Sequence, residues 1–578
     1  MNGKRLRGAC SALVLILTAT QGPVAAARPS PALDGAPTPE ACAKLGFESR
    51  PSRSFASGAY ATMPPPPPPS PMMAAPEMRA LPAPPAALAR IAPPVFEAPS
   101  QRDTERYPNA TANPVRRTAE APVSTFSIDV DTASYANVRR FLLEGQAPPS
   151  DAVRIEELIN YFDYDYAAPR DRRTPFAPTV AVVPSPWSSD REILHVGLQG
   201  YALPADRQPP LNLVFLIDTS GSMSAPDRLP LARQAMNVLV DQLDQDDRVS
   251  IVAYAGSAGA VLRPTDGRQK LMIRCALEHL SAGGSTAGGE GLELAYDLAR
   301  QNFDPDAVNR VVLLTDGDFN VGIADPERLK DFVAARRQDG VYLSVYGFGR
   351  GNYNDLMMQA LAQNGNGTAA YIDSLTEARR LFRDDLPASL FPIADDVKIQ
   401  IEFNPAVISE YRLIGYETRL LNREDFNNDQ VDAGEVGSGA AVTALYEITR
   451  TGAPSASDPL RYGREARPSP ATGDELAFLK VRFKPPGAET SQLISRPIRP
   501  SDRYGRLNDA PASSRWAVAV AAYGQKLRGD PWMRRDFDWA QIEALAQGAR
   551  GADPDGARAE FITLVRAARD ATDVRALN

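Results

Sequence analysis

Cysteine and histidine are scarce in this chain, with three and two copies among 578 residues. The positions of Cys10, Cys42 and Cys275 form neither a disulfide framework nor a C-x-x-C metal motif. Zinc and copper sites built from sulfur or imidazole are therefore not expected. His195 and His279 each stand alone, in a predicted strand and a predicted helix, so we interpret both as structural residues and not as catalysts.

The chain also has no excess of basic residues. It contains 63 Lys and Arg residues and 71 Asp and Glu residues, which gives a formal net charge of −8. A chain with no evident basic face is not expected to bind nucleic acid. The chain is too long for one hydrophobic core, and its length predicts two or three globular domains.

Residues 1–27 have the pattern of a secretory signal peptide. Basic residues between Lys4 and Arg7 precede an apolar run from Ala12 to Ala19 that is too short to span a bilayer comfortably. Small residues at 25–27 offer a cleavage site. For a bacterial source, we predict an exported protein of the periplasm or cell envelope. An uncleaved signal would instead tether the chain to the membrane.

Proline is concentrated in residues 28–120, which hold 21 of the 52 prolines, including the run Pro64–Pro69. Such a segment buries too little apolar surface to offset the entropy of ordering it. We predict a disordered, proline-rich linker, and we expect Cys42, which lies within it, to have no partner.

The apolar run Leu213–Ile217 is the clearest sign of a buried strand, and it ends abruptly in polar residues. Asp218, Ser220 and Ser222 follow as D-x-S-x-S, at the end of a central strand, where open α/β sheets hold their ligands. Carboxylate and hydroxyl oxygens suit Mg²⁺, Mn²⁺ or Ca²⁺. The motif alone is weak, since a serine in this position could simply cap the next helix.

Two further loops offer oxygen ligands. Gly283–Leu292, GGSTAGGEGL, places Thr286 among glycines that allow close approach of the backbone to an ion. Val311–Gly317, VVLLTDG, reads as a second buried strand that ends in Asp316. Three such loops in one α/β pattern favour a cation site.

These motifs together resemble a von Willebrand factor type A domain with an intact metal-ion-dependent adhesion site. The resemblance implies a metal site made of five residues, namely Asp218, Ser220, Ser222, Thr286 and Asp316. It also implies that hydroxyls hold the ion directly, that some carboxylates act through water, and that a partner's Asp or Glu completes the octahedron. Mg²⁺ is the expected ion, with Mn²⁺ or Ca²⁺ as alternatives.

A second resemblance covers the chain from about Asn113 to its C-terminus. The stretches NPVRRTAEAPVSTFSIDVDTASYANVRRFL, from Asn113, and RIEELINYFDY, from Arg154, are similar to the segment before the A domain in bacterial exported proteins of the YfbK group. This resemblance implies an architecture more than an activity.

The predicted fold is an α/β doubly wound A domain at 209–385, where strands and helices alternate. A small α/β segment precedes it at 121–208, and residues 386–578 are predicted to be β-rich, sandwich-like and then helical. Two strands before the A domain, Thr179–Val183 and Ile193–Leu198, need partners. We predict that they join the C-terminal sheet, so that the A domain is an insertion in a β module.

Two stretches invite functional readings that we weigh against plain structure. The run Tyr161–Tyr166, YFDYDY, is interpreted as a helix end with packed tyrosines and solvated carboxylates, although a binding role is possible. Asp425, Asn427 and Asp429 fall at positions 1, 3 and 5 of a calcium loop. Gln430 replaces the expected glycine and Glu435 comes one residue early, so a polar hairpin loop is the favoured reading.

Catalytic motifs are missing. The glycine-rich loop has no lysine, which argues against a phosphate-binding ATPase loop, and no G-x-S-x-G elbow surrounds the serines. We therefore predict a non-enzyme that binds an acidic protein partner through a divalent ion. The alternative is a structural or envelope-assembly scaffold that binds through its β module, with the metal incidental.

Overall fold

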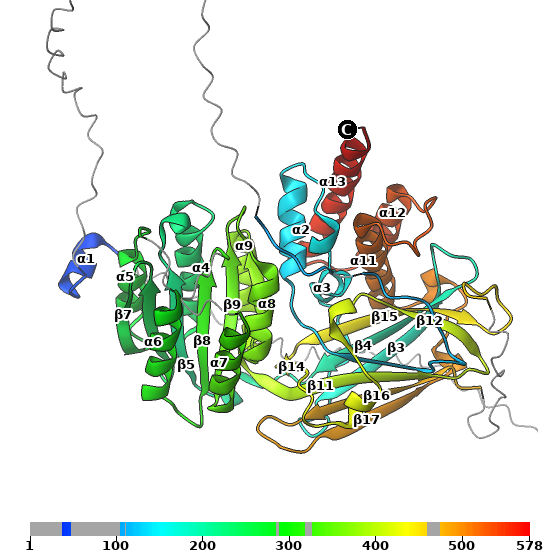
Figure 1. The fold of residues 1–578 in the computed structure, drawn as a ribbon, viewed down its shortest axis with the longest axis horizontal. Coiled ribbons are helices and arrows are strands. Elements are labelled where there is room, and N and C mark those ends of the chain that lie inside the picture. The colour runs from blue at the N-terminus through cyan, green and yellow to red at the C-terminus, as the bar shows by residue number, and fades with distance from the viewer. Residues whose placement is uncertain are drawn as a thin grey trace, which may run out of the picture.

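The computed structural model describes residues 37–47, 104–109, 111–284, 288–317, 326–458 and 474–577. An α/β domain lies beside a β-rich part, and a group of helices covers one side of the latter (Figure 1). The predicted signal peptide at 1–27 and most of the proline-rich segment lie outside the described residues. Among the described residues, no helix is both long and apolar enough to cross a membrane.

The α/β domain is built on one six-stranded sheet, with the strand order β10-β9-β8-β5-β6-β7. All neighbouring strands are parallel except β7, which runs antiparallel at the edge beside β6. The strands are β5 (Leu211–Asp218), β6 (Arg248–Tyr254), β7 (Ala258–Asp266), β8 (Val308–Thr315), β9 (Val341–Phe348) and β10 (Ala369–Ile372).

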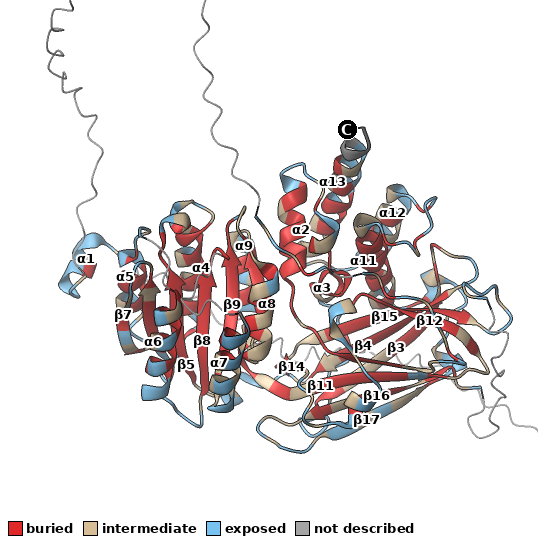
Figure 2. Cartoon of the chain, in the orientation of Figure 1, coloured by how far each residue is buried: buried red, intermediate tan, exposed pale blue. Residues whose placement is uncertain are grey.

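Helices cover both faces of this sheet. Alternate residues of β5 therefore pack into two different hydrophobic clusters, one on each face. Leu213, Phe215 and Ile217 pack with helices α4 (Leu229–Gln242) and α5 (Lys270–His279). Val214 and Leu216 pack with the opposite layer, which consists of α6 (Gly288–Gln301), α7 (Pro326–Gln338) and α8 (Asp355–Asn364). Figure 2 shows the buried strands between the helices. The predicted doubly wound fold is confirmed.

The β-rich part contains two antiparallel sheets, which we call the β module. One has the order β1-β12-β15-β4-β3, and the other β13-β2-β11-β16-β17, with β14 also pairing with β11. Its strands are β1 (Arg116–Arg117), β2 (Val123–Ser127), β3 (Phe176–Pro184), β4 (Glu192–Gly200), β11 (Pro392–Phe403), β12 (Ile408–Ile414), β13 (Leu420–Leu421), β14 (Gly434–Gly437), β15 (Ala441–Arg450), β16 (Ala477–Lys484) and β17 (Gln492–Ile498).

Strands from before and after the α/β domain are paired in both sheets. β4 pairs with β15, and β2 pairs with β11, so each sheet joins segments that are far apart in the sequence. The prediction that the flanking strands join the C-terminal strands is therefore confirmed. The α/β domain leaves the β module after β4 and returns to it at β11.

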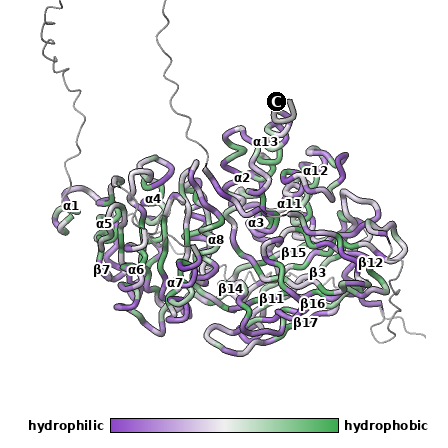
Figure 3. The backbone as a smooth tube through the Cα atoms, in the orientation of Figure 1, coloured by the Kyte–Doolittle hydropathy of each residue, from purple (hydrophilic) through white to green (hydrophobic). Residues whose placement is uncertain are grey.

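The β module has apolar layers on both sides of its five-stranded sheet. One cluster lies between the two sheets and includes Phe126, Leu194 and Ile399. The other packs β4 and β15 against helices α2 (Ala133–Leu143), α3 (Ile155–Asn160), α11 (Ala512–Arg528), α12 (Trp539–Ala549) and α13 (Ala557–Leu577). Figure 3 shows apolar stretches along the strands and hydrophilic stretches in the connecting loops.

The aromatic run after α3 is structural, as predicted. Tyr161, Tyr164 and Tyr166 are buried, whereas Asp163 and Asp165 between them are exposed. Tyrosine rings here fill the apolar cluster between the helices and the sheet, and the carboxylates remain in solvent. No binding role is needed to explain this pattern.

His195 is also structural. Its Nε2 lies 2.7 Å from the Tyr166 hydroxyl, and its Nδ1 lies 3.0 Å from the Ser514 hydroxyl. Burial lowers the pKa of His195 to about 3, so the ring is neutral at physiological pH. His279 packs its ring near that of Phe47, with centroids 6.0 Å apart.

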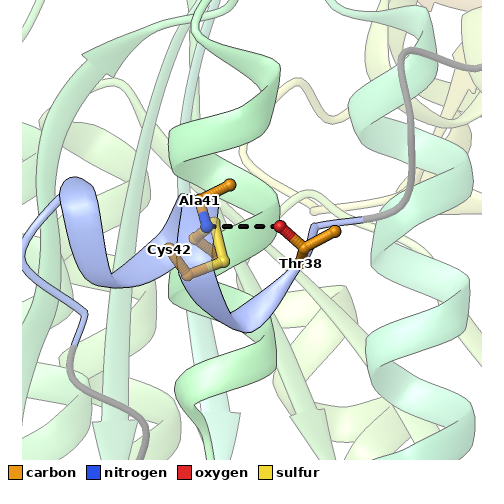
Figure 4. Close-up of a disulfide and its surroundings, with 4 residues drawn as sticks. Thr38, Ala41 and Cys42 are labelled. Atoms are coloured by element: carbon orange, nitrogen blue, oxygen red, sulfur yellow. Dashed lines mark hydrogen bonds between the residues drawn. A yellow bond between two sulfur atoms is a disulfide. The ribbon is translucent and has the colours of Figure 1, made fainter.

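The prediction that Cys42 has no partner is wrong. Cys42 lies in a short helix, α1 (Pro39–Lys44), and forms a disulfide with Cys275 of α5 (Figure 4). The Thr38 hydroxyl caps this helix by accepting a hydrogen bond from the Ala41 amide at 3.2 Å. Pairing depended on a residue 233 positions away, which spacing along the chain could not reveal.

The predicted linker is ordered at its C-terminal end as well. Residues 104–107 run beside the loop after β9, where the amides of Thr104 and Arg106 donate to the carbonyls of Gly351 and Tyr353. Ten residues later, β1 adds to the edge of the five-stranded sheet beside β12. The disorder predicted for 28–120 is therefore wrong for 37–47, 104–109 and 111–120.

Candidate metal site

Asp218 is the last residue of β5, and its carboxylate is held by donors from three directions. Its Oδ1 accepts from the Ser220 amide at 2.8 Å. Its Oδ2 accepts from the hydroxyls of Tyr254 and Thr315, both at 3.3 Å. Burial raises the pKa of Asp218 to about 6, and the nearby Asp316 carboxylate adds to this shift against the opposing hydrogen bonds.

The two predicted serines lie side by side in the turn after β5. Ser222 belongs to a short 3-10 helix at Gly221–Ser224, and Ser220 directly precedes it. Their hydroxyl oxygens are 3.0 Å apart. Octahedral Mg²⁺ binds oxygen at about 2.0–2.1 Å, which puts neighbouring ligands about 3 Å apart. The spacing of the two hydroxyls therefore fits two adjacent ligand positions.

Thr286 lies outside the described residues, but the backbone that leads to it is next to the serine turn. The Gly283 amide donates to the Thr219 carbonyl at 2.8 Å. The Gly221 amide donates to the Gly284 carbonyl at 3.0 Å. The start of the glycine-rich loop, Gly283 and Gly284, is thus docked onto the turn that carries both serines.

Asp316 directly follows β8 and is fully buried beside an arginine that the sequence did not identify. Arg228 Nη1 donates to Asp316 Oδ2 at 2.7 Å and to the Ser222 carbonyl at 2.7 Å. These bonds connect the serine turn to the second carboxylate. The structure therefore brings Asp218, Ser220, Ser222 and Asp316 together at one edge of the sheet.

One signal in the sequence could have identified Arg228. It directly precedes α4, and a cation next to a helix N-terminus is disfavoured by the helix dipole. Such a residue needs a compensating anion, and Asp316 provides it. Nothing in local spacing shows which carboxylate this is.

Gly317 is required by the close approach of the next loop. It has φ +98°, and a Cβ at this position would lie 2.6 Å from the Asn354 amide nitrogen and 2.8 Å from the Asn352 carbonyl. We expect Gly317→Ala to lower the free energy of unfolding by about 2–3 kcal/mol, through backbone strain and overpacking. Urea unfolding of the full chain measures this change.

A suitable control for Gly317→Ala is Gly487→Ala. Gly487 also has positive φ, at +74°, but no atom of the described residues lies within 4 Å of the point that a Cβ would occupy. This variant should lose only the conformational preference, about 1 kcal/mol. Equal losses in both variants would contradict a steric role for Gly317.

The donor set fits a hard cation that prefers oxygen ligands, and not a metal held by thiolate or imidazole groups. Among the described residues, no group of three or more His, Cys, Asp and Glu side chains could hold a metal ion. The candidate site differs from such groups, because it combines two carboxylates with hydroxyl oxygens. Oxygen donors of this kind suit Mg²⁺, Mn²⁺ or Ca²⁺.

The possible calcium loop is held by protein contacts instead. Asp429 Oδ1 accepts from Arg482 Nη2 at 3.0 Å, and the Ser491 hydroxyl also donates to it. Asp425 Oδ2 accepts from the Asn422 amide at 2.8 Å, which closes a local turn. Asn427 ends the 3-10 helix of this turn. These contacts favour the polar-loop interpretation.

The fold of the α/β domain is that of a von Willebrand factor type A domain. The family model described as "von Willebrand factor type A domain" matches residues 212–384, and one described as "von Willebrand factor" matches residues 101–195. Domains of this class are generally protein-interaction modules.

Similarity over most of the chain identifies the family. A model described as "Uncharacterized protein YfbK, C-terminal" matches residues 388–571. "Uncharacterized protein YfbK" of Escherichia coli (strain K12) is 45% identical over 478 residues, which cover 82% of each chain. The chain belongs to the YfbK family.

Two solved structures are similar at a lower level. "von Willebrand factor type A from Catenulispora acidiphila" is 17% identical, with 70% of this chain and 91% of that chain covered and a TM-score of 0.38. Proximal thread matrix protein 1 from the mussel byssus, solved "with zinc occupied MIDAS motif", is 23% identical, with 31% and 45% covered and a TM-score of 0.26.

Proposed function

We propose that this protein binds an acidic protein partner through a divalent cation held in the α/β domain. Five residues would hold the ion, namely Asp218, Ser220, Ser222, Thr286 and Asp316. Mg²⁺ is the favoured ion, and Mn²⁺ and Ca²⁺ suit the same oxygen ligands. The observation that carries the proposal is the 3.0 Å pair of serine hydroxyls beside the buried Asp218 carboxylate.

An acidic ligand follows from the charge and coordination of such a site. A small divalent cation takes six oxygens, and the protein offers few that are charged. A carboxylate from a partner that displaces water supplies both an oxygen and a negative charge, in a setting where charges are poorly screened. This is the chemistry that the cation contributes.

We further propose a non-catalytic, exported protein. The disulfide between Cys42 and Cys275 supports export, because disulfides persist mainly in oxidising compartments such as the bacterial periplasm. A hydrogen bond between Ser514 and His195 is fully buried, so substrate cannot reach this Ser–His pair. The hydroxyls of Ser220 and Ser222 contact each other, and the two histidines of the chain contact other residues.

The proposal is tested with Asp218→Asn, which keeps the shape and an acceptor oxygen but removes the charge. Full-length protein is used to capture partners from envelope extract in Mg²⁺ and in EDTA. We expect a partner that is retained in Mg²⁺ and lost both in EDTA and in the variant. Mn²⁺ binding, followed by electron paramagnetic resonance, should weaken at least about tenfold, because one ligand charge is gone.

Asp206→Asn is the matched control, since Asp206 is an exposed carboxylate in a 3-10 helix at Ala205–Arg207, shortly before β5 and outside the candidate site. It should bind Mn²⁺ and partner as the wild type does. A partner that is retained in EDTA and in Asp218→Asn would contradict the proposal. That outcome would favour the scaffold alternative, in which the β module makes the contacts.

A further inference from the structure

We propose that Arg228 makes the candidate metal site selective for a carboxylate ligand. Its positive charge leaves the site with a net positive charge once a divalent cation is bound. This inference rests on the proposed function and assigns to Arg228 the coupling between cation and acidic ligand. Arg228 is a positioning and specificity residue, because its guanidinium contacts the site residues Ser222 and Asp316.

Arg228 is fixed in the site by four hydrogen bonds. Nη1 donates to Asp316 Oδ2 and to the Ser222 carbonyl, both at 2.7 Å. Nη2 donates to the Arg350 carbonyl at 2.7 Å and to Asn352 Oδ1 at 3.0 Å. The residue is only 8% exposed. An exposed arginine at the end of a helix would have neither this burial nor these four hydrogen bonds.

The loop after β9 is shaped to admit this guanidinium. Gly349 has φ +70°, and a Cβ there would lie 2.4 Å from Arg228 Nε and 2.5 Å from its Cγ. Any side chain at 349 would therefore collide with the arginine. The cradle consists of Gly349, the Arg350 carbonyl and Asn352, so the position of the charge is built into the fold.

The net charge of the residues around the serines determines how strongly the site binds a cation and a carboxylate. Among the described residues, the hydrogen-bonded cluster around the serines holds the carboxylates Asp218 and Asp316 and the guanidinium of Arg228. Its net charge is −1, so a bound divalent ion makes it +1 and a ligand carboxylate makes it neutral. Without Arg228 the ion alone would neutralise the cluster, and a carboxylate would leave it negative.

Two opposite effects on binding follow. Arg228 lowers the affinity for the cation alone, because a like charge lies nearby in a poorly screened site. It raises the affinity for a carboxylate once the cation is present. Cation and carboxylate therefore bind as a linked pair, and by thermodynamic linkage each raises the affinity of the other by the same factor.

The test uses full-length protein, Mn²⁺ as the ion and acetate as the carboxylate, with acetamide as its neutral analogue. In the wild type, we expect acetate to raise the Mn²⁺ affinity about fivefold, after correction for Mn²⁺ complexed by free acetate, while acetamide has no effect. In Arg228→Gln, Mn²⁺ alone should bind about tenfold more tightly and acetate should change the affinity by less than about twofold.

Two further variants separate charge from folding. Arg233→Gln removes an arginine of the same helix that pairs with Glu278 of α5, and it should behave as the wild type. The double variant Arg228→Gln/Asp316→Asn removes both charges of the buried pair, so Asp316 does not remain as a buried charge without its arginine. Its cluster again has a net charge of −1, and the acetate effect should return, at a lower Mn²⁺ affinity.

The outcomes distinguish this inference from the function on which it rests. The proposed function and the inference are both overturned if the wild type binds no Mn²⁺, or binds it no more tightly than Asp218→Asn does. Arg228→Gln with the Mn²⁺ affinity and acetate effect of the wild type overturns the inference alone. A double variant without any acetate effect also overturns it, and thermal melting shows whether each variant is folded.

Discussion

Arg139→Ala is expected to lower the free energy of unfolding by about 3–5 kcal/mol, because it removes a cationic partner from two buried carboxylates. Arg139 of α2 donates to Asp373 Oδ2 at 2.7 Å and to Glu377 Oε2 at 2.7 Å, both in the α/β domain. It also donates to Glu560 Oε2 of α13 at 3.2 Å. One side chain thus holds together the segment before the α/β domain, that domain and the C-terminal helices.

Acid unfolding provides an independent readout of this cluster. Burial acts to raise the pKa of Glu377, but Arg380 and Arg139 hold it at about 2, below its ordinary value of 4.5. The ionised carboxylate therefore stabilises the folded state above pH 4.5, and this contribution is lost as the pH falls towards 2. In Arg139→Ala the pKa of Glu377 should be higher, so acid unfolding should begin at a higher pH.

Arg566→Ala is the control for Arg139→Ala. Arg566 pairs with Glu543 at 2.7 Å, but its side chain is 50% exposed, so solvent screens the pair. Its loss should cost at most about 1 kcal/mol. Urea unfolding that gives similar losses for both variants would contradict the role assigned to the Arg139 cluster.

Removal of the disulfide is expected to have the second large effect. The double variant Cys42→Ser/Cys275→Ser should lower the free energy of unfolding by about 2–4 kcal/mol, because a cross-link over a long loop restricts the unfolded chain. The two cysteines are separated by 233 positions, and both are buried in the folded protein. The same loss should appear when the wild type is unfolded in reductant.

Cys10→Ser is the control for the disulfide, since Cys10 lies outside the described residues and in the predicted signal peptide. It should leave stability unchanged, with and without reductant. A peptide map of the non-reduced wild type should contain the Cys42–Cys275 cross-link. Equal stability of the double variant and the wild type, in the presence of that cross-link, would contradict a stabilising role.

The sequence alone located most of the α/β domain and the core of its candidate site. The run Leu213–Ile217 forms a strand that ends at Asp218, and Ser220 and Ser222 lie in the turn after it. Both could be predicted, because strand and turn preferences act between near neighbours. The same local logic placed Asp316 at the end of β8. Because parallel strands share one direction, both carboxylates reach the same edge of the sheet.

The sequence also predicted that the strands before the α/β domain pair with strands after it. The two strands before the α/β domain pair with each other, but such a two-stranded ribbon leaves backbone groups unpaired at its edges, which required a further partner from elsewhere. The pairing of β4 with β15 meets that requirement. Sequence reasoning gave the need for a partner, whereas the register followed from packing on both faces of β4.

Only the tertiary structure decided the contacts between residues far apart in the chain. Arg228 meets Asp316 across 88 positions and Asn352 across 124, and Cys42 meets Cys275 across 233. Local propensities carry no information about such pairs, because they depend on how whole elements pack. The motif residues were therefore visible in the sequence, whereas the charge that sets their chemistry was visible only in the fold.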